Sequence, residues 1–379
     1  MIYMNTAAGA KPYKEVVEVM TDVMTNHWGN ASDNNSCGDD ARRIIENVRQ
    51  QFADDLNCSP EEIIFTGSGC EANTMAIMGF MKMNPAYSLI TTKLEHASIN
   101  EMLDYIDVSG RLPNDRTGLI HSDDVDNVLM RNAKRPFVSI SMANAEIGVV
   151  QSDIKDIIQV VHSYRGKIHC DATQLFPEQR IDVKDLGVDM LSLSAQKFNG
   201  PRGVGVLYVK RGIKISPIIY GSQEMGKRGG TYNTAAIAGM GKALEITRNN
   251  NKNTYVKTLR DDLLNQLLTI PNTCLNGPNI DDNNRLLNNI SLTIDGVNAE
   301  RLVTLCDLAG VIIAKGSACQ SHEPTPSKAL MAIGLSKEQA LSTIRITLDE
   351  FNTKEEVDKA SKIITALVER IRMDNDYQK

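Results

Sequence analysis

The chain has 379 residues, 41 of them basic and 47 acidic, and a net charge of −6. This length suffices for a large core and two domains, and the mild acidity gives no reason to expect nucleic-acid binding. No apolar run reaches the ~18 residues that a membrane helix needs, and the N-terminus lacks the basic-then-apolar order of a secretory signal. We therefore expect a cytoplasmic protein that binds neither nucleic acid directly nor a membrane.

The first two-thirds of the chain alternates apolar runs with helical patterns. Strands are predicted at 62–69, 88–92, 137–142, 167–171, 189–194 and 203–210, and helices include 71–83 and 153–165. Continuous apolar strands separated by helices indicate a mostly parallel sheet buried on both faces. Only "AQKFNGPR" joins the last two strands, which is too short for a parallel crossover, so the 203–210 strand should run antiparallel to its neighbours.

A polar, asparagine-rich segment at 247–257 indicates a bend or a domain boundary. Beyond it, helices and a few strands predict a smaller α+β domain, which ends in a helix at 353–372. We expect a large domain at 12–248. Residues 1–11 with 249–379 would form the small domain, which carries the loop at about 315–328.

That loop, "KGSACQSHEPTPSK", contains one of seven cysteines and has no regular periodicity. Cysteines of odd number and irregular spacing predict reduced thiols rather than disulfides. Cys319 and His322 have the spacing of half a metal site, but zinc needs three or four ligands, so we predict no metal. Cys319 is either an ordinary surface cysteine or the reason for the loop.

A strand, a glycine turn and a helix start follow each other in "FTGSGCEAN" (65–73). Ser68 and Glu71 have capping-box spacing, which supports a helix N-terminus there. Free backbone N–H groups at such a point attract phosphate. The alternative is an ordinary strand–helix turn, and the pattern is neither a dinucleotide fingerprint nor a Walker A loop.

Four further side chains are candidates because of their places next to predicted strands. Lys197 follows a buried strand, where desolvation would lower its pKa and allow a Schiff base, unless it reaches out to solvent. Asp171 ends a buried strand, where open α/β sheets bind ligands, and needs a cationic partner or several hydrogen-bond donors. His96 begins a helix, and a lone histidine is more often structural. Arg345 alternates with Ile344 and Ile346, so it should leave the core face and could grip a carboxylate.

In order along the chain stand "FTGSGCEAN", "EH", "ANAEIG", "CDATQ", "SLSAQKFNGPRGVGVLYV", "RGGTYN", "KGSAC" and "STIRITLDEFNTKEEVD". From about residue 3 to about 370, this series resembles the cysteine desulfurases, pyridoxal 5'-phosphate (PLP) enzymes of the class V aminotransferase group. The resemblance implies an α/β fold of the PLP-dependent aminotransferase type I, with a mostly parallel seven-stranded sheet, flanking helices and a smaller α+β domain.

The resemblance also implies a role for each matching residue. Lys197 would hold PLP as a Schiff base, and Asp171 would pair with its ring nitrogen. Gln174 would bond its phenolic oxygen and His96 would stack on its ring. The phosphate would be bound by Gly69, Cys70, Ser194 and Gln196, and by Thr231 of the other subunit of a homodimer. Arg345 and Asn144 would bind the substrate, and Cys319 would be the nucleophile.

By this resemblance L-cysteine would yield L-alanine and a persulfide on Cys319, which passes to a sulfur acceptor such as an iron–sulfur scaffold or a tRNA thiolation protein. The interval from Cys319 to Ser327 resembles the long-loop, iron–sulfur and nitrogenase-type group. The chain departs from the family at Ala145, where a second asparagine is usual, at Gln196, where a histidine is usual, and at Cys70, where a threonine is usual. The family's N-P-x-S-x-H motif is reduced to "GNASDNNSCG" (29–38).

Three other functions remain open at this point. A relative in the same fold could be a selenocysteine lyase or an aminotransferase, and an aminotransferase has no need of Cys319. A weakly active or idle paralogue could serve as a sulfur-transfer scaffold. An α/β protein without PLP would need eight ordered motifs to match by accident.

Overall fold

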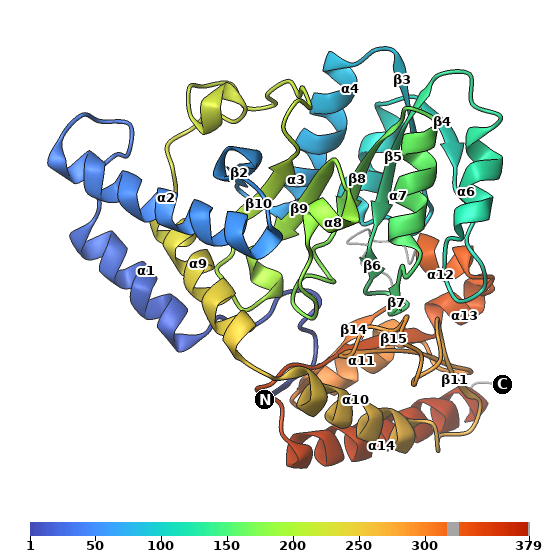
Figure 1. Cartoon of the computed structure of the whole chain (residues 1–379). Helices are drawn as coiled ribbons and strands as arrows, with labels where there is room; N and C mark the ends of the chain where they lie inside the picture. Colours follow the sequence, from blue (N-terminus) through green and yellow to red (C-terminus); the bar gives the residue numbers. More distant parts are fainter. Residues whose placement is uncertain (317–325, 378–379) are drawn as a thin grey trace.

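The computed structural model describes residues 1–316 and 326–377, with side chains up to 375 at the end of the last helix. A seven-stranded sheet forms the centre of the larger part of the molecule (Figure 1). Adjacent strands of this sheet are parallel, except that β10 is antiparallel to both β2 and β9. In sheet order the strands are β2 (Ile63–Thr66), β10 (Gly205–Val209), β9 (Met190–Ser194), β8 (Lys167–Asp171), β5 (Arg135–Ser141), β3 (Tyr87–Thr91) and β4 (Val108–Arg111). The mostly parallel sheet and the reversed strand are thus confirmed.

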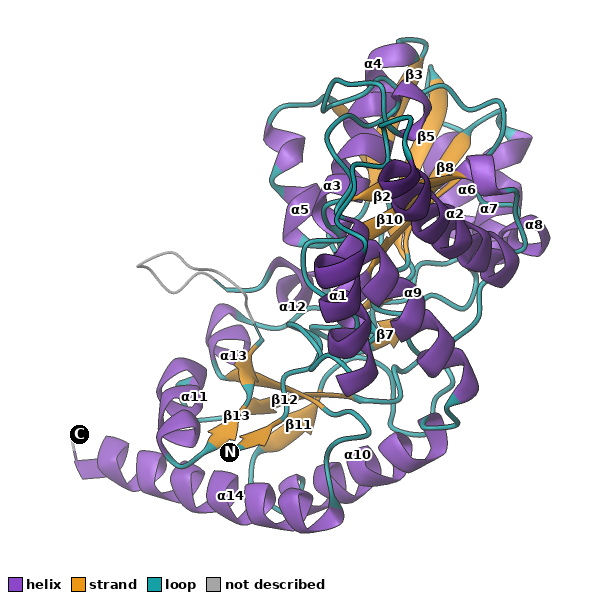
Figure 2. Cartoon of the chain, turned by 90° about the vertical axis from the view of Figure 1, so that its left-hand side faces the viewer, coloured by secondary structure: helices purple, strands orange, loops and turns teal. Residues whose placement is uncertain are grey.

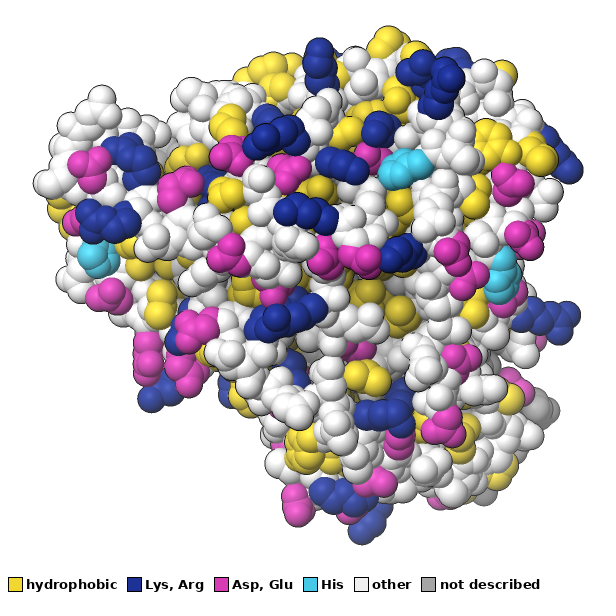
Figure 3. All heavy atoms as spheres, in the orientation of Figure 1, with side chains coloured by type: hydrophobic (Ala, Val, Ile, Leu, Met, Phe, Trp, Pro, Cys, Tyr) yellow, Lys and Arg dark blue, Asp and Glu magenta, His cyan; other side chains and the backbone are white. Residues whose placement is uncertain are grey.

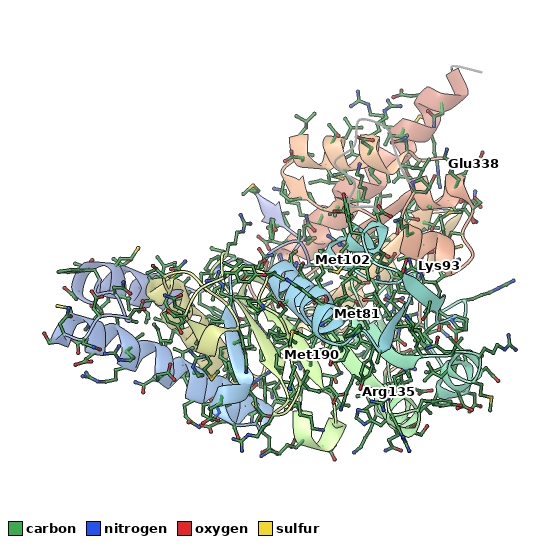
Figure 4. All side chains as sticks on the ribbon, turned by 90° about the horizontal axis from the view of Figure 1, so that it is seen from above. Met81, Lys93, Met102, Arg135, Met190 and Glu338 are labelled. Atoms are coloured by element: carbon green, nitrogen blue, oxygen red, sulfur yellow. The ribbon has the colours of Figure 1, made fainter. Side chains whose placement is uncertain are left out.

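Helices cover both faces of this sheet because successive strand residues point to opposite sides. On one face lie α3 (Gly69–Thr74), a π-helical turn (Met75–Gly79), α4 (Phe80–Met83) and α5 (Ala97–Asn100). On the other lie α2 (Ser36–Leu56), α6 (Ser122–Leu129), α7 (Ile154–Ser163), α8 (Val183–Leu186) and α9 (Thr234–Asn249), with α1 (Lys14–Asn26) packed on α9. Met81, Met102 and Met190, labelled in Figure 4, belong to the first of these packed faces.

The smaller part has its own antiparallel sheet and its own apolar core. Its sheet consists of β11 (Thr273–Leu275), β12 (Asn289–Ile294), β15 (Thr343–Thr347) and β14 (Ala314–Lys315), in that order. Around it lie α10 (Asn253–Leu267), α11 (Ala299–Leu308), α12 (Lys328–Ala332), α13 (Lys337–Leu341) and α14 (Lys354–Tyr377). Figure 2 shows α10 and α14 along its base.

The N-terminus lies with the smaller part, since β1 (Ile2–Tyr3) pairs in parallel with β13 (Val311–Ile312). The predicted break near 247–257 falls between α9 and α10. The hairpin of β6 (Ala143–Asn144) and β7 (Val149–Val150) packs against α12 and α13 through a separate apolar cluster. The division at 12–248 stays a prediction, which the two separate cores support.

None of the described helices is long and apolar enough to cross a membrane. In the same residues, no three His, Cys, Asp or Glu side chains gather as a metal site requires. Acidic and basic side chains are interspersed over the face in Figure 3.

A buried ion pair holds the long loop between β10 and α9 against the sheet. Arg49 of α2 donates to both carboxylate oxygens of Glu224, at 2.8 and 2.9 Å, and the Phe65 amide donates to the same carboxylate at 3.1 Å. Both Glu224 and Met225 have positive φ, an uncommon conformation for residues other than glycine. The pair therefore sustains a backbone that would not persist alone.

Glu224→Ala should lower the free energy of unfolding by about 3 kcal/mol, because Arg49 loses its only buried counter-charge among the described residues and keeps only the half-exposed Glu46 carboxylate and the Ile63 carbonyl as partners. Denaturant unfolding followed by circular dichroism measures this loss. Glu18→Ala is the matched control, because Glu18 pairs with Lys14 on the solvent-exposed side of α1 and exposed pairs contribute little. Equal effects of the two substitutions would contradict the importance of burial.

Candidate active site

A cavity of about 260 Å³ lies at the carboxyl ends of β5, β8 and β9. This is the edge where open α/β sheets bind ligands. The smaller part closes it through Arg345 of β15, and the N-terminal segment closes it through Ala7 and Ala8. The cavity therefore needs both parts of the molecule.

Asp171 is buried at the last position of β8. Its Oδ1 accepts from the Thr173 amide at 3.0 Å, and its Oδ2 accepts from Asn73 Nδ2 at 2.8 Å. A buried carboxylate needs such donors, because desolvation disfavours its charge. Asp171 also lines the cavity, so a cation there would meet a carboxylate whose orientation is already set.

Lys197 ends a 3-10 turn (Ala195–Lys197) directly after β9. Its Nζ donates to the carbonyl of Ala7 and, at 3.4 Å, to that of Ala8. Burial, with a contribution from the charge of Arg345, lowers the pKa of Lys197 to about 8, although Asp171 opposes the shift. A larger share of this amine is therefore uncharged and nucleophilic near neutral pH than for an ordinary lysine.

The start of α3 supplies backbone donors to the cavity. Ser68 is the N-cap and accepts from the Glu71 amide at 3.1 Å. Within the described residues, the amides of Gly69 and Cys70 make no hydrogen bond. A Cβ on Gly69 would lie 3.0 Å from Thr173 Cγ2 and 3.1 Å from Ser194 Cβ, so glycine permits this close approach.

The predicted capping box at this helix is half correct. The Glu71 carboxylate does not return to Ser68; it accepts from the Gly67 amide at 2.7 Å. It also pairs with Arg228 at 2.7 Å. Arg228 belongs to the loop between β10 and α9, so the helix start and this loop are tied together.

His96 is the N-cap of α5 and lies at the rim of the cavity. Its Nδ1 accepts from the Ser98 amide at 3.1 Å. The His96 side chain is exposed to solvent. The protein atoms around the ring nevertheless desolvate it and lower its pKa. The preceding Glu95 is buried and accepts from the Ser141 hydroxyl at 2.7 Å, which ties the His96 loop to β5.

Arg345 projects from β15 into the cavity, while Ile344 and Ile346 lie in the core, as the alternation predicts. Its Nη2 donates to Asn5 Oδ1 at 2.9 Å, and its buried Nε has no partner in the described part of the chain. Burial lowers the pKa of Arg345, and the nearby Glu146 carboxylate opposes this shift. Glu146 in turn accepts from the Ser327 hydroxyl.

Asn144 lines the cavity, but most of its amide is bonded to backbone. Its Nδ2 donates to the Leu94 carbonyl at 2.7 Å, and its Oδ1 accepts from the amides of Glu146 and Ile147 at 2.8 and 3.2 Å. Only one amide hydrogen remains for a substrate. The predicted substrate contact of Asn144 stays a prediction.

Ten of the predicted site residues come together around this one cavity, from both ends of the chain. They are Gly69, Cys70, His96, Asn144, Asp171, Gln174, Ser194, Gln196, Lys197 and Arg345. Thr231 does not line it and is exposed on the loop before α9. Cys319 and His322 lie outside the described residues, so the proposed loop nucleophile stays a prediction.

Several lining residues were not predicted as site residues. Asn73 stands four residues after Gly69, one helical turn further on, so helix periodicity could have placed it on the cavity side. Glu146 stood inside the quoted "ANAEIG" motif. The carbonyls of Ala7 and Ala8 had no signal in the sequence, because backbone groups of small residues carry none.

Comparison with known families assigns the chain that forms this cavity to a class of protein. Residues 2–360 match the family described as Aminotransferase class-V. The match covers nearly the whole chain, so the chain belongs to the class V aminotransferases.

Curated relatives identify the family within this class to which the chain belongs. Cysteine desulfurase IscS of Dictyoglomus turgidum is 36% identical over 387 residues, covering 100% of this chain and 97% of the relative. Cysteine desulfurase IscS 1 of Archaeoglobus fulgidus is 35% identical over 375 residues, covering 96% of each chain. Within its class, the chain belongs to the cysteine desulfurase family.

Solved structures agree with this family. A NifS-like protein from Rickettsia africae has a TM-score of 0.89 and 29% identity, covering 97% of this chain and 99% of that one. A structure described as SspA in complex with cysteine has a TM-score of 0.80 and 30% identity, covering 93% of this chain and 100% of that one. The predicted PLP-dependent aminotransferase fold is thus confirmed.

The chemistry of the cavity fits PLP, the cofactor that this family implies. The cavity combines an amine of lowered pKa in Lys197 with the buried, bonded carboxylate of Asp171. The amides of Gly69 and Cys70, which have no partner in the described part of the chain, and the Ser194 hydroxyl offer donors for a phosphate. An aldehyde, a ring nitrogen and a phosphate thus each find a suitable group.

In cofactor-free protein, Lys197 should react with formaldehyde and cyanoborohydride with a half-maximal rate near pH 8, since only the uncharged amine is nucleophilic and burial lowers its pKa to about 8. In urea-unfolded protein the midpoint should rise towards the ordinary lysine value of about 10.4. Mass spectrometry of the labelled peptide measures both rates. The same midpoint in both states would refute the effect of burial.

Proposed function

We propose that this protein is a PLP-dependent cysteine desulfurase, which converts L-cysteine to L-alanine and leaves a persulfide on Cys319. The observation that carries the proposal is the convergence of Lys197, Asp171, His96 and Arg345 on one cavity. The curated cysteine desulfurases that match over the full chain support the same reaction.

The residues around the cavity suggest how PLP would be held. Lys197 would bind its aldehyde, Asp171 its ring nitrogen, and the start of α3 with Ser194 and Gln196 its phosphate. Gln174 would reach its phenolic oxygen. When bound, PLP supplies an electron sink that stabilises negative charge at the substrate Cα.

Residues of the chain itself would bind the substrate, transfer the proton and take up the sulfur. Arg345 would bind the substrate carboxylate, because its Nε has no partner among the described residues and its Nη2 is held by Asn5. Lys197 Nζ would move the proton at the substrate Cα, for which a pKa of about 8 is suited. The Cys319 thiolate would then form a bond to the substrate sulfur as the carbon–sulfur bond breaks. L-cysteine and a thiol thus become L-alanine and a persulfide.

We further propose a homodimer and a protein that accepts the sulfur. Thr231 is exposed on its own chain, on a loop held by Glu224 and Arg228, which suits a residue that serves the other subunit. One structural relative is described in complex with cysteine, which supports L-cysteine as the substrate. An iron–sulfur scaffold or a thiolation protein stays the expected acceptor, and the cytoplasmic location stays a prediction.

Cys319→Ser should abolish release of sulfide from L-cysteine in the presence of dithiothreitol, because it replaces the proposed nucleophile by a hydroxyl, and Cys70, the one thiol among the described residues of the cavity lining, is proposed to lie at the phosphate. The parent protein should release sulfide and alanine in equal amounts, measured in the same reaction. Cys37→Ser is the matched control, because Cys37 is an exposed thiol that does not line the cavity. Unchanged sulfide release by Cys319→Ser would refute the proposal.

The same assay separates the related functions. An aminotransferase would yield a keto acid and no sulfide. A selenocysteine lyase would prefer selenocysteine over cysteine. An idle scaffold would release neither sulfide nor alanine with any of these substrates.

Arg345→Lys should raise KM for L-cysteine by roughly 10-fold or more, since it keeps a charge but loses the guanidinium fork, and hydrogen bonds to charged groups contribute about 1.5–3 kcal/mol. Initial rates of alanine release against substrate concentration measure this change. Lys315→Arg, on the neighbouring strand but outside the cavity lining, serves as a control of local packing. An unchanged KM in Arg345→Lys would exclude Arg345 as the carboxylate ligand.

A further inference from the structure

A series of hydrogen bonds runs along the cavity lining from Asp171 to His96, through two residues with no assigned role, Asn73 and Ser98. Asn73 of α3 is 1% exposed and donates through Nδ2 to Asp171 Oδ2 at 2.8 Å and to Ser98 Oγ at 3.1 Å. Ser98 Oγ lies 2.9 Å from His96 Nδ1. The Ser98 amide donates to the same nitrogen at 3.1 Å.

The donor and acceptor roles along this series of hydrogen bonds are fixed at both ends, because each end group can only accept or only donate. An ionised carboxylate only accepts, so the Asn73 atom that faces Asp171 must be its NH₂ group. A backbone amide only donates, so His96 Nδ1 must be the acceptor from Ser98 and carries no hydrogen. These two ends leave one arrangement for the atoms between them.

The Ser98 hydroxyl is the link in that arrangement. Both hydrogens of Asn73 Nδ2 are used, one on Asp171 and one on Ser98 Oγ. Because Ser98 Oγ accepts from Asn73 and faces an unprotonated His96 Nδ1, its own hydrogen points to that nitrogen. Asn73 Oδ1 is then left buried without a partner in the described residues, a cost that the two donated bonds offset.

From this geometry we infer that Asn73 and Ser98 are positioning residues, which hold His96 as the neutral tautomer with its hydrogen on Nε2. The ring then meets the cavity as a hydrogen-bond donor. It can gain a proton only at Nδ1, which would place that proton against the Ser98 amide hydrogen. A ring held in this tautomer has its donor at Nε2, on the side away from Ser98.

The surroundings of His96 agree with a neutral ring. Desolvation by the protein atoms around the ring has the largest effect and lowers the pKa of His96. The charged groups that face the ring are of both signs and oppose each other: Asp171 and Glu101 raise the pKa, and Lys197 and Arg345 lower it. The tautomer of His96 follows from hydrogen bonds within the protein. Only its use in catalysis rests on the proposed function.

The test reads the tautomer directly in holoprotein labelled with ¹⁵N-histidine. Two-bond ¹H–¹⁵N correlation spectra distinguish protonated from unprotonated ring nitrogens, and His96→Gln identifies the signals of this ring. The spectra should show Nε2 protonated and Nδ1 unprotonated from about pH 6.5 to 8.5, above the ordinary histidine pKa of about 6.5. A ring with its hydrogen on Nδ1, or a charged ring in this range, would overturn the inference.

Substitution of Ser98 tests the relay itself. Ser98→Ala removes the hydroxyl donor that favours the neutral ring, so the His96 pKa should rise by about 0.5–1, the equivalent of one hydrogen bond. Ser98→Thr keeps a hydroxyl and should restore the parent value. A His96 titration in Ser98→Ala that matches the parent would remove Ser98 from the relay. Because neither spectrum depends on turnover, this result is separable from failure of the sulfide and alanine assay.

Discussion

The site is organised around one buried charge, the Asp171 carboxylate at the end of β8. A carboxylate without solvent is costly unless donors surround it, and here Asn73 and the Thr173 amide provide them. The parallel register places Ser141, Asp171 and Ser192 side by side on β5, β8 and β9, so the strands end at a common edge. The start of α3, the His96 loop and Lys197 all meet at that edge.

The second constraint is that neither part of the molecule contains a complete site. Arg345 comes from the smaller sheet, and its Nη2 is held by Asn5 of the N-terminal segment. That segment bridges the two parts, since the Ala7 amide donates to Thr347 while the Ala7 carbonyl accepts from Lys197. The grip on a substrate carboxylate and the reactive amine are therefore positioned by the same short stretch of chain.

Much of this arrangement could be predicted because its signals are local. Continuous apolar runs predicted the buried strands, and alternation predicted that Arg345 leaves the core. The edge strand β4 was missed because "VSGR" has no apolar run and is half exposed. The partner of Glu71 could not be predicted either, since Arg228 is distant in sequence and the pairing depends on the tertiary fold. For Asn144, the motif indicated a substrate contact but not the three backbone partners that occupy its amide.

The central claim is that Lys197 is the residue to which PLP binds. Reduction of the purified holoprotein with borohydride, followed by digestion and mass spectrometry, tests it most directly, because reduction makes the Schiff base permanent. The account predicts a phosphopyridoxyl group on Lys197 and loss of the visible cofactor band. A modification on another lysine, or on none, would contradict it.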